Sequence, residues 1–194
     1  MNLLLVVLAL PLIGFFISLF LPAETAKRFS LGFSVVIFLA SLGLVGPVIS
    51  GGGASPQFEI DVPWIDSPNI HFHLSLDGLA LWLVILSTLL TPLCILVSWN
   101  YIKERVSSYY AFLLLLEFGV IGVFSAMDLF LFYTFWEITL VPMYFLIGIW
   151  GHDRRIYATV KFFLYTMAGS VLMLAAIIYL YGRAGTFDYP AILE

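Results

Sequence analysis

Six apolar stretches, each long enough to cross a lipid bilayer, dominate the sequence. A helix needs about 20 predominantly apolar residues to span a hydrocarbon core roughly 30 Å thick. The chain has 194 residues, of which 62% are hydrophobic and 10% charged, whereas a soluble domain holds about 25% charged residues. Lipid must therefore solvate most of the chain, which we interpret as an all-α integral membrane protein. The stretches that predict transmembrane helices cover residues 3–21, 29–50, 77–99, 109–126, 128–150 and 156–181.

The first stretch is interpreted as a retained helix, because no charged residue precedes Leu21 and a signal peptide needs a positive leading segment. Positive charges gather in the connections on the cytoplasmic side of membrane proteins. The connections after the first, third and fifth stretches share one side and hold six of the seven cations flanking the helices. We therefore expect both termini on the outer side. The six cations are Lys27, Arg28, Lys103, Arg105, Arg154 and Arg155, and Arg183 lies opposite.

The outer connection, residues 51–76, predicts a short β-hairpin, because residues 57–62 and 70–76 alternate between apolar and polar side chains around a Pro-containing segment. His71 and His73 would point the same way, but two ligands without a third favour a solvated hairpin face over a metal site. Asp77 and Asp128 are expected to cap helix N-termini. The predicted divisions are helices one and two (1–50), the hairpin loop (51–76), helices three to six (77–181) and an outer tail (182–194).

Glu137 is the ionisable residue that most needs an explanation, since charged groups inside a membrane mark functional sites. It would lie roughly 13–14 Å from the outer end of its helix, near the bilayer midplane. Tyr133 and Thr134 lie one turn before it, and Tyr144 lies two turns after it. Pro142 removes the hydrogen bond to the Ile138 carbonyl and favours a kink that can hold water. The alternatives are a proton-transferring carboxyl and a neutral carboxyl with a structural role.

Glu117 and Lys161 are two further ionisable residues within predicted helices. Glu117 and Glu137 are each ten residues from Met127, so in a tight antiparallel hairpin they would lie at equal depth in the membrane. If the two carboxyls faced each other, they would share a proton. Lys161 would lie roughly 9 Å deep, too far from Glu137 for a salt bridge. Tyr165 should share its face, and Lys161 is either a relay cation on a water path or an interfacial anchor.

Two segments of the chain carry specific motifs. One is Phe135-Trp136-Glu137 followed by 140–146, within a longer run from 122 to 170, and the other joins 62–65 to 76–79. In these residues the chain resembles the chain M family of NADH-quinone oxidoreductase, respiratory complex I. The resemblance spans roughly residues 60–175. It implies an antiporter-like, proton-translocating membrane subunit in a bacterial or organellar inner membrane, with Glu137 matching the family's essential glutamate and Lys161 a further family lysine.

The resemblance also implies what lies outside this chain. Family members have about fourteen helices, so these six correspond to the N-terminal portion, and another chain or segment would supply the missing helices and the lysine that pairs with Glu137. NADH, FMN, iron–sulfur clusters and quinone would be bound by other subunits of the complex, whose membrane subunits would be partners. We expect no cofactor, metal or redox centre in this chain.

Other functions remain open at the level of sequence. A subunit of a multi-chain sodium/proton antiporter or of a membrane-bound hydrogenase would share these motifs. A scaffold with structurally satisfied buried acids is a third possibility. The chain contains no basic patch or Gly-rich phosphate loop, so nucleic acid is not an expected partner. Its single cysteine, Cys94, excludes an internal disulfide and is expected to be a small buried hydrophobe.

Overall fold

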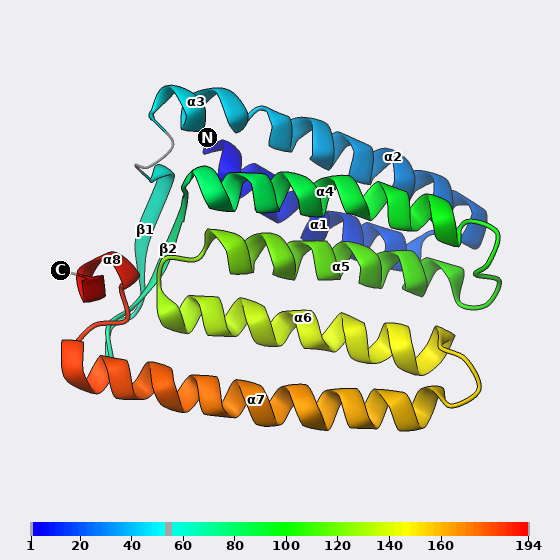
Figure 1. The fold of residues 1–194 in the computed structure, drawn as a ribbon. Helices are drawn as coiled ribbons and strands as arrows, with labels where there is room; N and C mark the ends of the chain where they lie inside the picture. The colour runs from blue at the N-terminus through cyan, green and yellow to red at the C-terminus, as the bar shows by residue number, and fades with distance from the viewer. Residues whose placement is uncertain (1, 53–55, 194) are drawn as a thin grey trace.

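Six helices in the computed structural model are long and apolar enough to cross a membrane, which confirms the predicted fold class. The structure describes residues 2–52 and 56–193. Figure 1 shows the long helices lying side by side along one direction, with a two-stranded sheet across one end. The described elements are α1 (Leu3–Phe20), α2 (Ala23–Leu42), α3 (Val45–Ser50), β1 (Gln57–Ile65), β2 (Ile70–Leu76), α4 (Gly78–Ser98), α5 (Val106–Ser125), α6 (Leu129–Trp150), α7 (Arg155–Ala184) and α8 (Tyr189–Leu193).

The second membrane span begins earlier than predicted. It starts at Ala23 rather than at residue 29, directly after Pro22, whose φ of −60° suits the residue before a helix. Lys27 and Arg28 therefore lie in the early turns of α2 and not in a connection, and Lys27 pairs with Glu24 at 3.1 Å. At its other end α2 stops before Gly43 and resumes as α3. The span as a whole runs over Ala23–Ser50.

The last membrane span is longer than predicted. α7 has 30 residues and ends at Ala184, because Gly185 adopts the left-handed conformation (φ +75°) typical of a helix C-terminus. At 1.5 Å per residue α7 is about 45 Å long, more than a hydrocarbon core of about 30 Å requires. In the extra turns Tyr181 stacks on Phe187 of the C-terminal tail with ring centroids 4.3 Å apart, in a cluster that includes Ile70 of β2.

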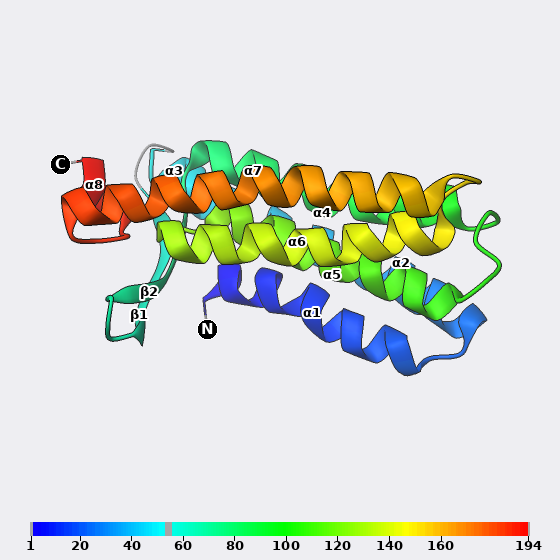
Figure 2. The ribbon, with the colours of Figure 1, turned by 90° about the horizontal axis from the view of Figure 1, so that it is seen from below.

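α5 lies at the centre of the bundle and contacts α1, α2, α4 and α6. α6 packs between α5 and α7, so that α5, α6 and α7 follow one another as antiparallel neighbours (Figures 1 and 2). The contact between α5 and α6 is tight. A Cβ at Gly119 would lie 2.8 Å from Cγ2 of Thr139, and one at Gly122 would overlap the ring of Phe135. The two backbones therefore approach closely, as membrane helices do where small residues meet.

Hydroxyl side chains connect the N-terminal helices. Ser18 of α1 and Ser30 of α2 share a buried hydrogen bond of 2.7 Å, and Ser41 of α2 shares one of 2.8 Å with Thr88 of α4. Such bonds join helices in a solvent that offers no alternative partner. Cys94, in contrast, is exposed on α4 and is not the buried hydrophobe expected from its apolar surroundings.

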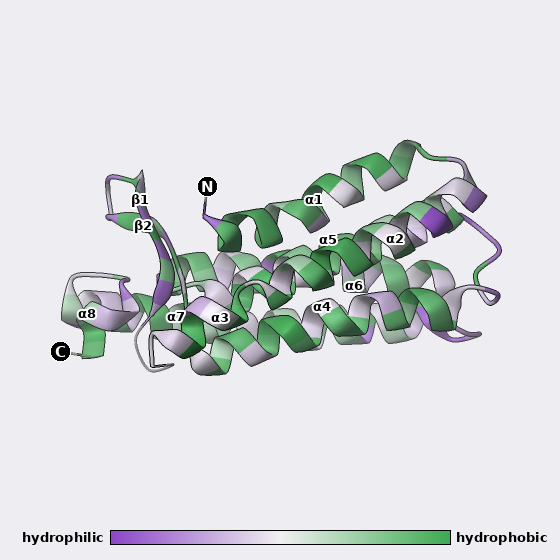
Figure 3. Cartoon of the chain, turned by 90° about the horizontal axis from the view of Figure 1, so that it is seen from above, coloured by the Kyte–Doolittle hydropathy of each residue, from purple (hydrophilic) through white to green (hydrophobic). Residues whose placement is uncertain are grey.

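The polar segments gather at the two ends of the bundle, as Figure 3 shows. One end holds the α1–α2, α4–α5 and α6–α7 connections, which confirms that these three share a side of the bundle (Figure 1). The other end holds the hairpin, where β1 and β2 pair antiparallel as predicted, although β1 extends through Pro63 into the expected turn. Asp77 and Asp128 cap α4 and α6 as predicted, accepting hydrogen bonds from backbone N–H groups of the first turn.

Candidate functional site

Glu137 is the ninth residue of α6, about 12 Å from its first residue and about 20 Å from its last. The side chain is half-buried. Its Oε1 atom is buried and has no hydrogen-bond partner among the described residues. Pro142 lies inside α6 and has no N–H, so the Ile138 carbonyl, one residue beyond Glu137, lacks the usual hydrogen bond from the residue four positions later. A polar patch of side chain and backbone thus lies within a largely apolar helix.

The hydroxyl residues predicted around Glu137 have different partners. Tyr133, one turn earlier, interacts both with Glu137 and with Ser170 of α7, so it connects the carboxyl to the neighbouring helix. Thr134 instead donates to the Phe130 carbonyl at 2.9 Å within α6. Tyr144 is partly exposed and packs edge-on against Phe163 of α7, with ring centroids 5.5 Å apart.

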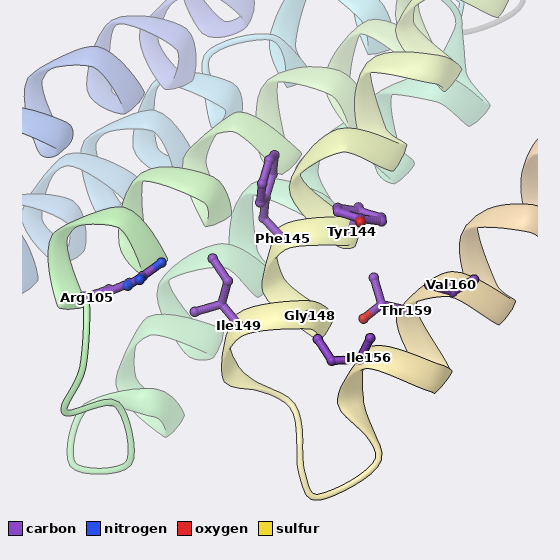
Figure 4. Close-up of a pocket in the computed structure, with 8 residues that line it drawn as sticks. All are labelled: Arg105, Tyr144, Phe145, Gly148, Ile149, Ile156, Thr159 and Val160. Atoms are coloured by element: carbon purple, nitrogen blue, oxygen red, sulfur yellow. The ribbon is translucent and has the colours of Figure 1, made fainter.

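Two adjoining cavities follow the groove between α6 and α7. The first, of about 300 Å³, lies toward the end of the bundle opposite the hairpin and is lined by Arg105, Thr159 and residues of both helices around Gly148 (Figure 4). The second, of about 410 Å³, shares Tyr144 with the first and extends to Val141. Val141 is one helical turn from Glu137 on the same face of α6. The groove therefore runs from Arg105 to within one helical turn of Glu137, although Glu137 is not among the residues that line it.

Arg105 is the residue of this groove that the sequence did not single out. It was assigned only to a basic connection, but it precedes α5 with a left-handed backbone (φ 48°) and lines the cavity shown in Figure 4. A positive φ is uncommon for a residue other than glycine. No pattern in the sequence predicts a left-handed backbone at Arg105. The side chains of α6 and α7 reach Arg105 only because these two helices pack against each other.

Glu117 does not face Glu137. Its side chain is 3% exposed and interacts with Thr91 of α4. Gly119, which touches α6, is two residues from Glu117 and so about 160° away around α5 at 100° per residue. The structure therefore does not support the shared proton that equal distance from Met127 suggested, because equal depth does not fix the direction in which a side chain points.

Lys161 lies on the exposed face of α7, away from Glu137. Its Nζ is 5.8 Å from the centre of the Tyr157 ring, and Tyr165, 83% exposed, shares its face as predicted. Ser170, which faces α6, is nine residues away, or about two and a half turns, so the two point in opposite directions. Within residues 2–52 and 56–193 Lys161 forms no ion pair.

His71 and His73 of the hairpin bind carboxylates. His71 Nδ1 is 2.5 Å from Asp61 Oδ1. The ring of His73 lies between Asp188 of the C-terminal tail (2.6 Å) and Glu59 of β1 (3.2 Å). In the part of the chain that the structure describes, no group of three or more potential ligands fits a metal ion. The sequence did not predict the contact between hairpin and tail, which joins residues 115 positions apart.

Comparisons with known proteins agree with this architecture. Residues 126–194 match the family model described as NADH:quinone oxidoreductase/Mrp antiporter, transmembrane. NADH-ubiquinone oxidoreductase chain 4 of Prototheca wickerhamii is 42% identical over 200 residues, covering 94% of this chain and 38% of that protein. NADH-quinone oxidoreductase subunit M of Rickettsia prowazekii is 46% identical over 138 residues, covering 71% of this chain and 28% of that protein. The chain thus spans about a third of the length of these relatives.

Solved structures contain the same fold. A chain of respiratory complex I from Thermus thermophilus with bound NADH superposes with a TM-score of 0.84 at 25% identity, covering all of this chain and 39% of that one. A chain of an archaeal membrane-bound sulfane sulfur reductase superposes with a TM-score of 0.82 at 22% identity, covering 97% of this chain and 39% of that one. A chain of the Mrp complex from Dietzia sp. DQ12-45-1b superposes with a TM-score of 0.84 at 21% identity, covering 98% of this chain and 20% of that one. At these identities the two structures share the fold alone.

Proposed function

Because this chain belongs to the family of NADH:quinone oxidoreductase membrane subunits named subunit M and chain 4, we propose that it is part of a proton-translocating subunit of that enzyme complex. Glu137 is the group that carries the proton. Quinone reduction elsewhere in the complex drives this transfer, and NADH, FMN, iron–sulfur clusters and quinone are held by other subunits. The chain itself contributes membrane helices and proton-transferring side chains rather than a redox centre.

The observation that carries the proposal is the state of the Glu137 carboxyl. Its Oε1 atom is buried without a hydrogen-bond partner among the described residues, in a helix where proline has freed a carbonyl. A buried polar atom of this kind costs free energy and is retained where function requires it. The α6–α7 groove runs from Arg105 to Val141, one helical turn from Glu137, and is the route that we propose for the proton.

The remaining site residues have unequal roles in this proposal. Tyr133 connects Glu137 to α7 and is a candidate for hydrogen-bonding the transferred proton. Tyr144 lines both cavities of the groove. Lys161 and Tyr165, on the far face of α7, act in proton transfer only together with helices that are not in this chain. Glu117 belongs to a separate site between α4 and α5.

The placement in the membrane follows from the same reasoning. We propose that the end with the three basic connections faces the cytoplasm or its organellar equivalent, and that the hairpin and both termini face outward. The partners are other membrane subunits of the complex and the chain or segment that completes the family's fourteen helices. The membrane is the inner membrane of a bacterium or organelle.

Replacement of Glu137 by glutamine tests the proposal. Glu137→Gln keeps the size and hydrogen-bonding capacity of the side chain but cannot release a proton, so proton translocation by the assembled complex in vesicles should fall at least tenfold. Glu137→Asp should retain part of it. The matched control is Glu104→Gln, in an exposed residue of the α4–α5 connection whose backbone carbonyl, and not its carboxyl, binds Trp150. Unchanged translocation by an assembled Glu137→Gln complex would show that this carboxyl is structural, as in a scaffold.

A subunit of a sodium/proton antiporter is the second candidate, favoured by the family description that includes Mrp antiporters and by the shared fold of the Mrp complex. Purification of the native complex distinguishes the two. Subunits carrying flavin and iron–sulfur clusters should co-purify with the chain if it serves NADH:quinone oxidoreductase. A complex of membrane chains without these groups would favour the antiporter.

A further inference from the structure

A cavity between α4 and α5 contains a carboxyl that the Glu137 site does not use. The cavity has a volume of about 200 Å³ and is lined by Ser87, Thr91, Cys94, Leu116 and Glu117, among others. Glu117 is 3% exposed, and neither of its carboxyl oxygens has a hydrogen-bond partner among the described residues. The walls are otherwise mainly leucine and valine side chains. An unpaired carboxyl in such a place is the feature to be explained.

The hydroxyls beside Glu117 offer lone pairs rather than protons. The hydroxyl of Ser87 donates to the Leu83 carbonyl at 2.8 Å, and that of Thr91 donates to the Ser87 carbonyl at 3.2 Å. Each hydroxyl has one proton, so both can only accept a further hydrogen bond in this arrangement. An ionised Glu117 would therefore gain a donor only if one of these hydroxyls turned away from its carbonyl acceptor. A protonated carboxyl can donate to the lone pairs of Thr91, which lines the same cavity.

No cation is present to stabilise an ionised Glu117. The residues that line the cavity include no lysine, arginine or histidine. Within residues 2–52 and 56–193, no ion pair involves Glu117. Because burying an unpaired charge is unfavourable, the carboxyl must carry a proton or be reached by water. The cavity has the volume for several water molecules and three polar side chains to bind them.

The cavity also opens to the outside of the bundle. Cys94 in its lining is exposed, as is Leu90, with 47% of its surface accessible. Glu117 reaches this opening on the side of α5 that faces α4, about 160° from the glycine that touches α6. The carboxyl is thus separated from Glu137 by the body of α5 and by the tight α5–α6 contact.

We propose that Glu117, Thr91 and Ser87 form a second proton-binding site, in which a protonated Glu117 carboxyl exchanges its proton with water in the α4–α5 cavity independently of Glu137. Its role as a relay in translocation rests on the proposed function. The protonation and hydration of the site do not, and both can be measured without following transport. The ligand is a proton carried with water, because one carboxyl and two hydroxyls provide a single negative charge at most.

Infrared difference spectroscopy of the assembled complex tests the protonation state. The spectrum of the wild-type complex minus that of Glu117→Gln should contain the C=O band of a protonated carboxyl. This band should shift within minutes in D₂O, and it should persist in Glu137→Gln because the sites are independent. Thr91→Val, which keeps the shape but removes the acceptor, should move the band to higher frequency. Thr91→Val also tests the protonation of Glu117 if the complex with Glu117→Gln does not assemble.

The same spectra contain the results that would overturn the proposal. Absence of the band would mean that Glu117 is ionised. A band that does not shift in D₂O would mean a dry structural acid. Loss of the band on replacing potassium by sodium would mean that the site binds a metal cation. If Glu137→Gln abolished transport while the Glu117 band failed to appear, the proposed function would stand and this inference alone would fall.

Cys94 provides a second test, by chemical labelling, because it is the chain's only cysteine and lines the cavity. Alkylation by maleimide requires a thiolate, which forms in contact with water. We expect N-ethylmaleimide to label Cys94 in the native complex, as measured by mass spectrometry of the peptide and scaled to labelling after denaturation. Glu117→Leu, which removes the polar wall, should slow labelling severalfold. Equal rates in both proteins, or no labelling of the native complex, would contradict a hydrated cavity.

Discussion

Replacement of Asp188 by asparagine should loosen the attachment of the C-terminal tail to the hairpin. The ring of His73, 8% exposed, lies between two carboxylates, with Nδ1 2.6 Å from Asp188 and Nε2 3.2 Å from Glu59. The two ring nitrogens thus join β1, β2 and the tail through their carboxylate contacts.

The two contacts of His73 should differ in strength. A hydrogen bond to a charged group such as a carboxylate contributes about 1.5–3 kcal/mol when it is shielded from water. The Asp188 side chain is 32% exposed, so we reduce this to about 1–2 kcal/mol, whereas Glu59 is 63% exposed and its contact should contribute about 0–1 kcal/mol. A loss of about 1–2 kcal/mol corresponds to a factor of about 5–30 in a local opening equilibrium.

Hydrogen exchange of two backbone amides measures this opening. The N–H of Leu129 donates to Phe187 at 2.9 Å, and that of Tyr189 donates to Met127 at 2.8 Å, so both are protected only while the tail is attached. In Asp188→Asn both should exchange about 5–30 times faster. In Glu59→Gln the change should be threefold or less. Equal effects of the two variants, or none in either, would refute the reasoning.

Three further substitutions test the packing of the bundle, each followed by the thermal unfolding midpoint of the assembled complex. Gly122→Ala should destabilise the α5–α6 contact by about 1–3 kcal/mol, whereas Gly32→Ala, where a Cβ meets nothing within 4 Å, should not. Ser41→Ala should cost about 0.6–1.7 kcal/mol by leaving Thr88 without its interhelical partner. Asp128→Ala should cost about 1–2 kcal/mol because α6 loses its N-terminal cap.

The sequence predicted features that depend on local pattern. The six spans follow from uninterrupted apolar runs, the hairpin from alternation with period two, and the two aspartate caps from their position before apolar runs. The start of α2 was predicted late because Glu24, Lys27 and Arg28 lower the apolar character of its first turns, although charged residues are compatible with the aqueous end of a helix.

Features that depend on the rotation of a helix about its axis could not be predicted in this way. All helices here carry apolar residues on every side, so the pattern does not show which face of α5 meets α6. Glu117 illustrates the consequence, since its depth was predictable and its direction was not. The contact of His73 with Asp188 was hidden for another reason, because it joins segments far apart in the chain.

The rotation of α5 decides how the two buried carboxyls can work. Glycine at positions 119 and 122 lets α5 and α6 approach so closely that Thr139 and Phe135 of α6 occupy the space in which a Cβ would lie. Glu137 therefore interacts with α7 through Tyr133, and Glu117 interacts with Thr91 of α4. A proton passing from one to the other would have to leave the α5–α6 pair and travel around it. The expectation that Glu137→Gln leaves the proton on Glu117 in place follows from this packing.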